Sequence, residues 1–408
     1  MRYFLRVFGC RVNQAEASEL GGRLAAAGWA QVRTLVEAEL IVVRTCSVTR
    51  DADREALKFL RRAGRDNPGA RLVVGGCLAS RSPGEILRAA PQARVADGDL
   101  GDALGLPPAA AAAPGRARAL LKVQDGCDGS CAYCIVPRVR PRLDSLAPEA
   151  AEERVRRLAA AGAPEIVLCG IRLGRYRHGT TGLSGLLERL LVVPGAFRLR
   201  LSSLEITEAD DCLAGLIAGS GGRLCPHLHL PLQSGCEATL RRMRRPYTAQ
   251  AFARRVGSLS RQIPGLAVFT DVITGFPGET EAGHRESLGL VQSLGLRGLH
   301  VFRYSAREGT PAAAFPDPVP ADVVRQRLAG WLELDASLRR AHARDAAGQE
   351  RVGVPLRSGT EAVTEDFLTV RLDRRLQAGL WRVRVAAAEG DALRAQILGP
   401  CDLLEKPL

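Results

Sequence analysis

The feature that most constrains the fold is a regular alternation of strand-like and helix-like segments from Leu120 to Ser305. Apolar strand-like runs such as EIVLCG, HLHLPL and AVFTDVITGF are separated by helix-like stretches such as PEAAEERVRRLAAAG and TAQAFARRVGSLSRQ. Chains that alternate in this way bury a parallel sheet beneath helices. The pattern therefore predicts one large β/α domain, a complete or partial barrel, over residues 116–340.

Three segments near the N-terminus share another pattern, an apolar strand-like run that ends in a cysteine. The runs end at Cys10, Cys46 and Cys77, and helix-like stretches lie between them. This alternation predicts a separate parallel-sheet α/β domain over residues 1–115. Because the carboxyl ends of parallel strands share one edge of a sheet, we expect the three thiols to converge there. The alternative is that they are small buried hydrophobic residues.

Two changes of composition divide the chain further. The stretch from Leu104 to Ala119 is rich in Pro, Ala and Gly, as linkers are. A long helical segment, 323–347, precedes strand and turn patterns with period-two alternation in LTVRL and WRVRV. Residues 341–408 are therefore predicted to form a small all-β domain.

Composition and charge narrow the class of protein. The hydrophobic fraction is 46%, and no apolar run is long enough to span a membrane. The start, MRYFLRVFGC, has Arg6 inside its apolar run and no small-residue cleavage site, so we expect a cytoplasmic protein without membrane contact. The net charge of +13 favours a polyanionic partner, although the dominance of Arg over Lys is also typical of codon bias.

One group among the eleven cysteines has the spacing of a metal site. Cys127, Cys131 and Cys134 form a C-x3-C-x2-C loop directly after an apolar run. Three thiolates can each bind one iron of a 4Fe-4S cluster, and without a fourth cysteine nearby one iron stays open. An open iron can chelate S-adenosylmethionine (SAM), whose reductive cleavage gives a deoxyadenosyl radical. The motif favours a radical SAM enzyme over a chance cluster or a zinc loop, because zinc normally takes four protein ligands.

The motifs, taken in order, resemble those of the radical SAM methylthiotransferases. FGCRVNQAEASEL, VVRTCSVT and VVGGCLA are similar to the three cysteine motifs of that family's N-terminal domain, and DGCDGSCAYCIVP to its radical SAM loop. LRLSSLE, CPHLHLPLQSG, TDVITGFPGET and FRYSAREGTPAA follow in the family's order, and the C-terminal module resembles a TRAM domain. The resemblance implies two 4Fe-4S clusters, an auxiliary one at Cys10, Cys46 and Cys77 and a radical-generating one at Cys127, Cys131 and Cys134.

Members of this family modify either tRNA or a ribosomal protein. GCRVNQAE, CPHLHLPLQSG and VFRYSAREGTPAA most resemble the branch that inserts a methylthio group at carbon 2 of N6-threonylcarbamoyl-adenosine beside the tRNA anticodon. Other branches act on isopentenyl-adenosine in tRNA or on a ribosomal-protein aspartate. The resemblance implies two SAM molecules, one methylating a sulfur carried at the auxiliary cluster and one generating the radical. The implied partners are the tRNA anticodon stem-loop and an electron donor such as flavodoxin or ferredoxin; the sulfur donor is open.

The resemblance also implies a set of SAM contacts at the expected strand ends and within the radical SAM loop: Tyr133, Gly170, Glu205, Gln233 and Asp271. For Glu205 and Asp271 a structural ion pair with a neighbouring cation is an equal alternative.

Several other residues have simpler interpretations. The GFPGET segment lacks the Lys and Ser of a phosphate-binding loop, so a nucleoside triphosphate site is not expected there. His227 and His229 alternate on one strand and are expected to pack or form hydrogen bonds. Cys169 and Cys236 stand where the family commonly has Thr or Ser, and each is expected to be structural because it lacks a partner at ligand spacing.

Two further positions depart from the family pattern. Arg44 stands where the family usually has Asn, which predicts a fixed cation near the auxiliary cluster and a raised reduction potential. The loop after Pro137, PRVRPRLDSL, with Arg138 and Pro141, replaces an aromatic residue and a Gly-rich stretch, which predicts altered substrate recognition. These departures support an alternative class, a non-catalytic iron-sulfur or zinc RNA-binding protein.

Overall fold

The computed structural model describes residues 1–107, 118–386 and 393–401. The chain forms two compact units, each built from several stretches. Unit 1 comprises Met1–Gly115, Asp125–Asp144 and Ser305–Ala313, and unit 2 comprises Arg116–Gln124, Ser145–Tyr304 and Ala314–Leu408. The predicted radical SAM loop, and the FRYSAREGT motif from Ser305 onward, therefore contribute to the same unit as the N-terminal cysteines.

Unit 1 is built on a five-stranded parallel sheet, as the alternation at the N-terminus predicts. Its strands run in the order β2-β1-β3-β4-β5, and their bounds are β1 (Arg2–Val7), β2 (Ala30–Gln31), β3 (Leu40–Thr45), β4 (Arg71–Gly76) and β5 (Arg94–Val95). The helices are α1 (Arg11–Ala26), α2 (Arg50–Asp66), α3 (Cys77–Arg81), α4 (Pro83–Ala89), α5 (Leu100–Ala103) and α6 (Val136–Val139).

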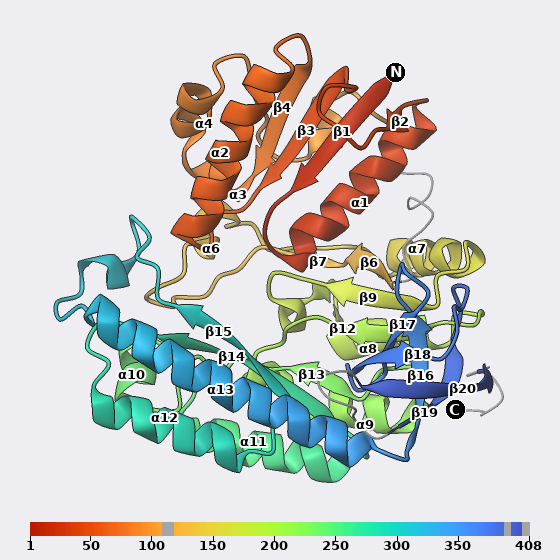
Figure 1. Cartoon of the computed structure of the whole chain (residues 1–408), viewed down its shortest axis with the longest axis vertical. Coiled ribbons are helices and arrows are strands. Elements are labelled where there is room, and N and C mark those ends of the chain that lie inside the picture. Colours follow the sequence, from red (N-terminus) through yellow and green to blue (C-terminus); the bar gives the residue numbers. More distant parts are fainter. Residues whose placement is uncertain (108–117, 387–392, 402–408) are drawn as a thin grey trace. The chain divides into compact units, whose positions relative to one another are not determined.

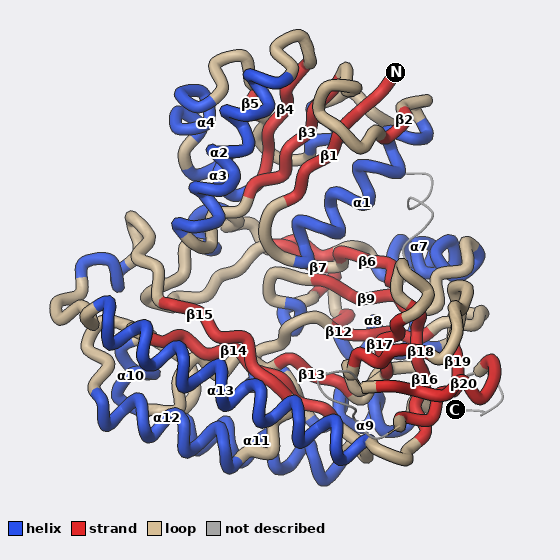
Figure 2. The backbone as a smooth tube through the Cα atoms, in the orientation of Figure 1, coloured by secondary structure: helices blue, strands red, loops and turns tan. Residues whose placement is uncertain are grey.

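The helices of unit 1 cover both faces of this sheet, with α1 on one side and α2, α3 and α4 on the other (Figures 1 and 2). Ile41 and Val43 point toward the α2 side, whereas Leu40 and Val42 pack against α1. All six residues of β3 are buried because a central strand of a parallel sheet is covered on both faces. Helix α2 begins after Thr49, whose side chain accepts a hydrogen bond from the Ala52 amide.

Unit 2 contains two three-stranded parallel sheets, β12-β9-β6 and β13-β14-β15. A parallel bridge between Ser203 and His229 joins them, so the six strands form one open β/α array of the partial-barrel kind. The strands are β6 (Arg118–Lys122), β9 (Glu165–Cys169), β12 (Arg198–Leu201), β13 (His227–His229), β14 (Ala267–Thr274) and β15 (Gly298–Arg303). This confirms the β/α repetition predicted from Leu120 onward.

Helices and short elements connect these strands. The helices are α7 (Pro148–Ala160), α8 (Leu183–Leu191), α9 (Asp211–Gly219), α10 (Glu237–Arg242), α11 (Ala249–Gln262) and α12 (Glu281–Ser293), with 3-10 turns η1 (Leu173–Arg175), η2 (Ile206–Glu208) and η3 (Pro311–Ala314). The two-residue strands are β7 (Gln124–Asp125), β8 (Asp144–Ser145), β10 (Arg177–His178) and β11 (Thr181–Gly182). The long helix α13 (Ala321–Ala346) packs along β15 (Figure 1).

The C-terminal module is a closed five-stranded barrel in the order β16-β17-β18-β20-β19, as a TRAM-like domain requires. Its strands are β16 (Glu350–Pro355), β17 (Glu361–Thr364), β18 (Thr369–Leu372), β19 (Trp381–Val385) and β20 (Arg394–Pro400). Val383 and Val385 are buried while Arg382 and Arg384 are exposed, so the predicted period-two alternation is correct.

A buried charge cluster holds this barrel on the β/α array. Glu165 is fully buried and accepts hydrogen bonds from Arg118, Arg198 and Arg200. Arg198 also donates to the Val363 carbonyl at 2.9 Å, and Arg200 donates to the Thr364 carbonyl at 2.8 Å. Two arginines of β12 thus satisfy carbonyl groups of β17 that would otherwise be buried without partners.

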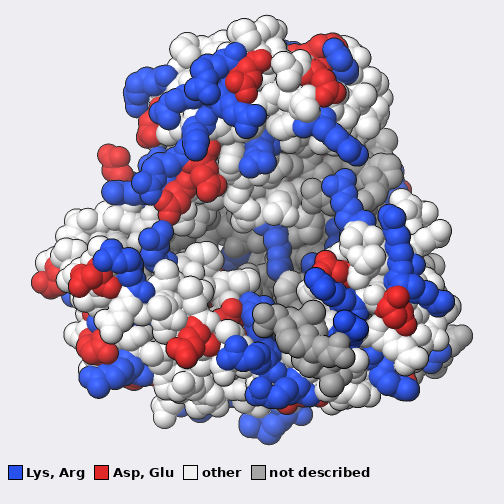
Figure 3. Space-filling view, in the orientation of Figure 1, with Lys and Arg blue, Asp and Glu red and all other residues white. Residues whose placement is uncertain are grey.

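The predicted linker from Leu104 to Ala119 lies mostly outside the described residues, and its last two residues, Arg118 and Ala119, belong to β6. Within the described parts of the chain, no helix combines the length and the apolar character needed to cross a membrane. Basic side chains are spread over the face seen in Figure 3, with acidic ones between them. Helix α2 contributes the exposed residues Lys58, Arg61 and Arg65.

Candidate iron-sulfur and SAM site

The structure brings Cys10, Cys46 and Cys77 to one edge of the unit 1 sheet. Strand β3 pairs with both β1 and β4, and the cysteines follow these three strands at their carboxyl ends. Cys10 caps the N-terminus of α1, and Cys77 is the first residue of α3. The convergence that the sequence predicts is therefore present, and their role as metal ligands stays a prediction.

Two glycines allow these strand ends to approach closely. Gly9 has φ +90°, and a Cβ there would lie 2.6 Å from the Cys46 sulfur. Gly76 has φ +97°, and a Cβ there would lie 2.5 Å from the Thr45 carbonyl oxygen. Only glycine suits a positive φ with so little space. Gly9 and Gly76 therefore seat the Cys10 and Cys77 segments against the Cys46 segment, which makes a compact cradle for a shared group.

The thiols in this cradle influence one another electrostatically. Burial raises the pKa of Cys46 to about 11, the Val48 amide opposes this rise, and the nearby Cys77 and Cys10 add to it. Burial also raises the pKa of Cys77, which Arg140 opposes through its charge and a hydrogen bond. Metal ligation needs thiolates. A group bound here must therefore supply the positive charge that stabilises them, as an iron-sulfur cluster does.

The second cysteine group lies on the loop 125–144. Cys127, Cys131 and Cys134 are all partly exposed, whereas Cys46 and Cys77 are buried. The Cys127 amide donates to the Arg140 carbonyl at 3.1 Å, and the Gly129 amide donates to the Cys127 sulfur at 3.3 Å. Amide donors of this kind stabilise ligating thiolates and tune cluster potential. The loop thus presents three accessible sulfurs on a folded backbone.

The FRYSAREGTPAA segment, far away in the sequence, forms hydrogen bonds with the chain near both cysteine groups. Arg307 is buried; it donates to the Ser47 hydroxyl at 2.9 Å and pairs with Asp53. Asp53 also accepts from Arg81 at 3.0 Å. The Ala312 amide donates to the Ala132 carbonyl at 2.8 Å, within the radical SAM loop. One short segment therefore supports both the chain after Cys46 and the loop that carries Cys131 and Cys134.

Arg44 is not an isolated cation near the cysteines. It is buried and pairs with the buried carboxylate of Glu16, on α1. The sequence predicts a fixed cation here, and the structure adds its carboxylate partner: Glu16 lies six residues after Cys10, and the helix turns it toward β3. A raised reduction potential of the auxiliary cluster stays a prediction. The altered loop after Pro137 also meets this carboxylate through Arg140, which donates to both Glu16 oxygens at 2.9 and 3.0 Å.

The five predicted SAM contacts are divided between the units. Tyr133 lies on the radical SAM loop of unit 1, and Gly170, Glu205, Gln233 and Asp271 lie in unit 2. Gly170 follows β9, and a Cβ there would lie 2.8 Å from the Leu173 Cα. Gln233 has φ +70°, and its backbone amide donates to the backbone carbonyl of Asp271 at 2.8 Å. SAM binding by these five residues remains a prediction.

Both acidic residues in this set have cationic or imidazole partners. Glu205 pairs with Arg245. Asp271 accepts from His229 Nε2 at 2.8 Å and from His300 Nδ1 at 3.2 Å. Burial raises the Asp271 pKa, but the hydrogen bonds from the two histidines outweigh it and lower the pKa overall. The ligand atoms of His229, Asp271 and His300 all lie within 4.8 Å of one another, on adjacent strands.

The remaining candidates behave as expected from the sequence. His227 packs with tilted rings against Phe269 and Phe367, whose ring centroids lie 5.3 and 4.7 Å away. Cys169 and Cys236 are both buried. In GFPGET, the Gly275 amide donates to the Glu279 carboxylate at 2.7 Å.

Sequence reasoning missed Asn13, Glu16, Arg140, Asp53 and Arg307 as site residues. Asn13 and Glu16 are separated by three residues after Cys10, which places them on one helix face. That spacing was the available signal for these two. Arg140 and Arg307 carry no comparable signal, because each reaches partners more than a hundred positions away in the sequence.

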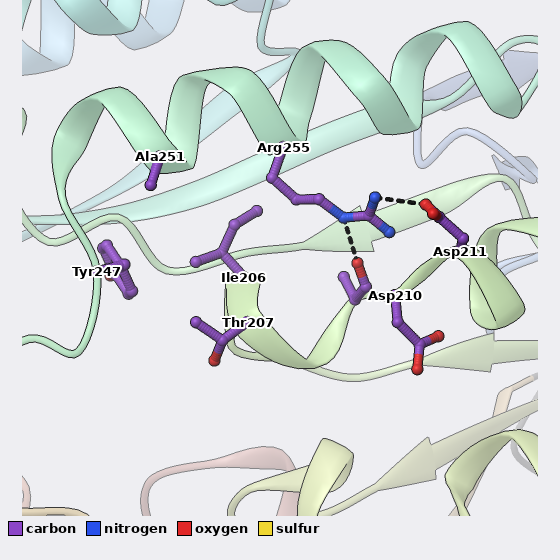
Figure 4. A pocket seen from close by; sticks show the side chains of 8 residues that line it. Ile206, Thr207, Asp210, Asp211, Tyr247, Ala251 and Arg255 are labelled. Atoms are coloured by element: carbon purple, nitrogen blue, oxygen red, sulfur yellow. Dashed lines mark hydrogen bonds and ion pairs between the residues drawn. The ribbon is translucent and has the colours of Figure 1, made fainter.

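Unit 2 also has an open cavity of about 340 Å³ beside η2 and α11 (Figure 4). Ile206, Tyr247 and Ala251 form part of its wall. Arg255 lines it too, but its guanidinium donates to the Ala209 carbonyl at 2.5 Å and to Asp211 at 2.6 Å. None of the predicted cluster or SAM residues lines this cavity, so we assign it no part in the reaction.

Known proteins resemble this chain over most of its length. Residues 2–98 match the uncharacterized protein family UPF0004, and residues 121–291 match the radical SAM superfamily. Threonylcarbamoyladenosine tRNA methylthiotransferase MtaB of Bacillus subtilis is 35% identical over 82% of this chain and 80% of its own. The chain belongs to the radical SAM methylthiotransferases. The tRNA-2-methylthio-N(6)-dimethylallyladenosine synthase of Desulfosudis oleivorans is 32% identical over 90% of this methylthiotransferase and 86% of its own chain.

Solved structures support the fold of this methylthiotransferase. The radical SAM methyltransferase TsrM of Kitasatospora setae, bound to cobalamin and a 4Fe-4S cluster, aligns with a TM-score of 0.52 over 74% of this chain and 75% of its own, at 14% identity. The cobalamin-dependent radical SAM enzyme OxsB aligns with a TM-score of 0.53 over 82% of this chain and 56% of its own, at 11% identity. At these identities the comparison concerns the fold alone.

Proposed function

We propose that this methylthiotransferase inserts a methylthio group at carbon 2 of N6-threonylcarbamoyl-adenosine beside the tRNA anticodon. The observation that carries the proposal is the presence of two separate cysteine triples within one compact unit, on the motifs of this family. The named activity of the MtaB relatives supports the substrate branch. A dimethylallyl-adenosine substrate is the second candidate, because synthases of that kind are 30–32% identical to this chain.

The residues present fit the two 4Fe-4S clusters and the SAM that this activity needs. Cys10, Cys46 and Cys77 would hold the auxiliary cluster in the cradle that Gly9 and Gly76 keep free of side chains. The radical-generating cluster would be held by the partly exposed Cys127, Cys131 and Cys134. When bound, the clusters and SAM supply the methylated sulfur and the radical that removes hydrogen from the adenine.

The protein's own contribution is to hold these groups and to bind tRNA. The amides of Val48 and Gly129 donate to the Cys46 and Cys127 sulfurs at 3.5 and 3.3 Å, which stabilises thiolates there. Tyr133, Gly170, Glu205, Gln233 and Asp271 are proposed to contact SAM. Exposed basic residues, including those of α2, suit the phosphates of an anticodon stem-loop. We further propose that the enzyme acts in the cytoplasm and takes electrons from flavodoxin or ferredoxin. Its functional regions are proposed to be an auxiliary-cluster domain at 1–115, a radical SAM core at 116–340 and a TRAM-like domain at 341–408.

Two experiments test the proposal. Anaerobically reconstituted protein should bind about eight irons per chain and form deoxyadenosine from SAM with dithionite. Mass spectrometry of tRNA nucleosides from a deletion strain should show loss of the methylthio-threonylcarbamoyl-adenosine signal and its return on complementation. Loss of the methylthio-isopentenyl signal would select the second candidate. An unchanged profile would redirect the activity to a ribosomal protein, and zinc content without SAM cleavage would favour a non-catalytic RNA-binding protein.

A further inference from the structure

The largely buried guanidinium of Arg140 lies among the segments that carry the two cysteine triples. Arg140 directly follows the short helix α6, six residues after Cys134, and its side chain is only 10% exposed. An arginine with so little contact with water needs protein acceptors for most of its donors. Its partners therefore show which parts of unit 1 it holds in place.

One set of partners lies on the helix that follows Cys10. Arg140 Nη1 and Nη2 donate to the two Glu16 oxygens at 3.0 and 2.9 Å, and Nη2 also donates to Asn13 Oδ1 at 3.0 Å. Asn13 is fully buried, and its side-chain Nδ2 donates to the backbone carbonyls of Phe8 at 2.8 Å and Thr45 at 3.0 Å. Arg140 is thus linked through Asn13 to the backbone just before Cys10 and just before Cys46.

A second set of partners lies on the radical SAM loop. Arg140 Nη1 is 2.8 Å from both oxygens of Asp125, which lies two residues before Cys127. The Arg140 carbonyl accepts the Cys127 amide at 3.1 Å. Side chain and backbone of one residue therefore both fix the start of this loop.

The third contact is with a cluster cysteine. Arg140 lies near enough to Cys77 for its positive charge to oppose the rise in the pKa of that thiol that burial causes. A cation beside a ligating sulfur stabilises the more negative state of a cluster and raises its reduction potential. The carboxylates of Glu16 and Asp125 lie beside the positive charges of Arg140 and Arg44.

We propose that Arg140 is a positioning residue that holds the Cys127–Cys134 loop against the cradle of Cys10, Cys46 and Cys77, with its positive charge on the side of the auxiliary cluster. This rests on the proposed function, because it assigns the two triples to two clusters. The consequence is that Arg140 couples SAM cleavage at one cluster to sulfur transfer at the other. Lysine cannot replace it, because an ammonium lacks the planar fork that reaches Asp125, Glu16 and Asn13 together.

The test compares Arg140→Gln and Arg140→Lys with the matched control Arg142→Gln, whose side chain lies on the same loop but is exposed. Each reconstituted full-length protein is assayed for iron, deoxyadenosine and methylthiolated tRNA, and EPR-monitored titration gives the cluster potentials. We expect Arg140→Gln to lower methylthio product per deoxyadenosine formed at least tenfold, and to make the auxiliary cluster potential more negative. Arg140→Lys keeps the positive charge but not the planar fork. It should therefore restore the auxiliary cluster potential more fully than the ratio of methylthio product to deoxyadenosine.

A product ratio and potentials equal to those of the control would overturn the proposal. If Arg140→Gln does not bind both clusters, Glu16→Gln is assayed in its place. This substitution keeps the shape of the Glu16 side chain but weakens its hydrogen bonds to Arg140, so it should also lower the ratio of methylthio product to deoxyadenosine. An unchanged ratio in Glu16→Gln would count against the proposal. Failure of the proposed function would look different, because the unsubstituted enzyme would then cleave SAM without methylthiolating tRNA. The cluster potentials from EPR would still show whether Arg140 affects the auxiliary cluster.

Discussion

Arg44 and Glu16 form an ion pair whose side chains are 5% and 8% exposed, directly beside the N-terminal cysteine cradle. Glu16 also binds Arg140, so one carboxylate serves two arginines. Burying charges is expensive unless each is paired and hydrogen-bonded, which this arrangement achieves with the help of Asp125. The Arg at position 44 is therefore compatible with a functional cluster site.

Replacing Arg44 by Asn, the residue usual in the family, should lower stability only moderately. Glu16 keeps Arg140 as its partner, so we expect a loss of roughly 1–3 kcal/mol in the free energy of unfolding. Denaturation of the apoprotein in urea measures it, with Arg54→Asn, an exposed position, as the control. A loss as small as that of the control would mean that the pair contributes little, and loss of cluster binding would mean that Arg44 is needed at the site.

Cys46→Ala should separate the two half-reactions. The radical SAM loop is untouched, so deoxyadenosine formation should persist, whereas methylthio transfer should be abolished because the auxiliary cluster loses a ligand. Deoxyadenosine and tRNA nucleosides are quantified in the same reaction. Cys212→Ala, an exposed thiol on α9, is the control and should behave like the unsubstituted enzyme. Persistence of both products in Cys46→Ala would refute ligation by the three N-terminal cysteines.

Glu165→Gln should strongly destabilise unit 2. The substitution leaves Arg198 and Arg200 buried without their anion, and uncompensated buried charges of this kind cost about 3–5 kcal/mol. Because both arginines also donate to barrel carbonyls, we expect the C-terminal barrel to become sensitive to protease. Urea unfolding and limited proteolysis check this against Glu188→Gln, an exposed position on α8. Equal behaviour of the two variants would show that the charge cluster is dispensable.

Asp366 should contribute to acid sensitivity. Burial raises its pKa, but hydrogen bonds from His342 and Thr364 and the charges of His342 and Arg351 lower it overall, below the value of an exposed carboxyl. Its stabilisation is therefore fully present above about pH 4 and is lost as the pH falls through the lower folded-state value. Asp366→Asn should flatten the acid limb of the stability profile, and Glu333→Gln, exposed on α13, should not. Stability is measured by urea unfolding between about pH 2 and pH 7, which covers the range below the pKa of an exposed carboxyl.

The basic face of α2 should contribute to tRNA binding. Lys58 and Arg61 are exposed three residues apart on that helix, so the Lys58→Gln/Arg61→Gln double variant removes two neighbouring charges. We expect weaker binding of an anticodon stem-loop and a salt dependence shallower by about 0.7–0.9 for each phosphate that the variant no longer neutralises. Arg261→Gln, an exposed position in unit 2, is the control. If both variants bind alike, the α2 face has no special role.

Local sequence patterns determined much of the architecture. The alternation of strands and helices predicted the parallel sheets, period-two alternation predicted the barrel strands, and the strand-then-cysteine pattern placed Cys10, Cys46 and Cys77 at one sheet edge. These features depend on hydrophobic periodicity and on the geometry of parallel strands, which a single sequence carries in full. The C-x3-C-x2-C spacing of Cys127, Cys131 and Cys134 is likewise visible in the sequence alone.

Tertiary structure alone decided which charges meet. The sequence shows Arg44 as a cation near the cysteines and Arg140 as part of a loop that departs from the family pattern, but only the fold shows that both bind Glu16. Arg307 likewise reaches Ser47 across more than two hundred residues. Ion pairs and hydrogen bonds between distant segments leave no periodic signature, because their partners are set by how the elements pack and not by spacing along the chain. The sequence thus determined the strands, helices and cysteine motifs, and the fold determined how the two cysteine groups are held in one unit.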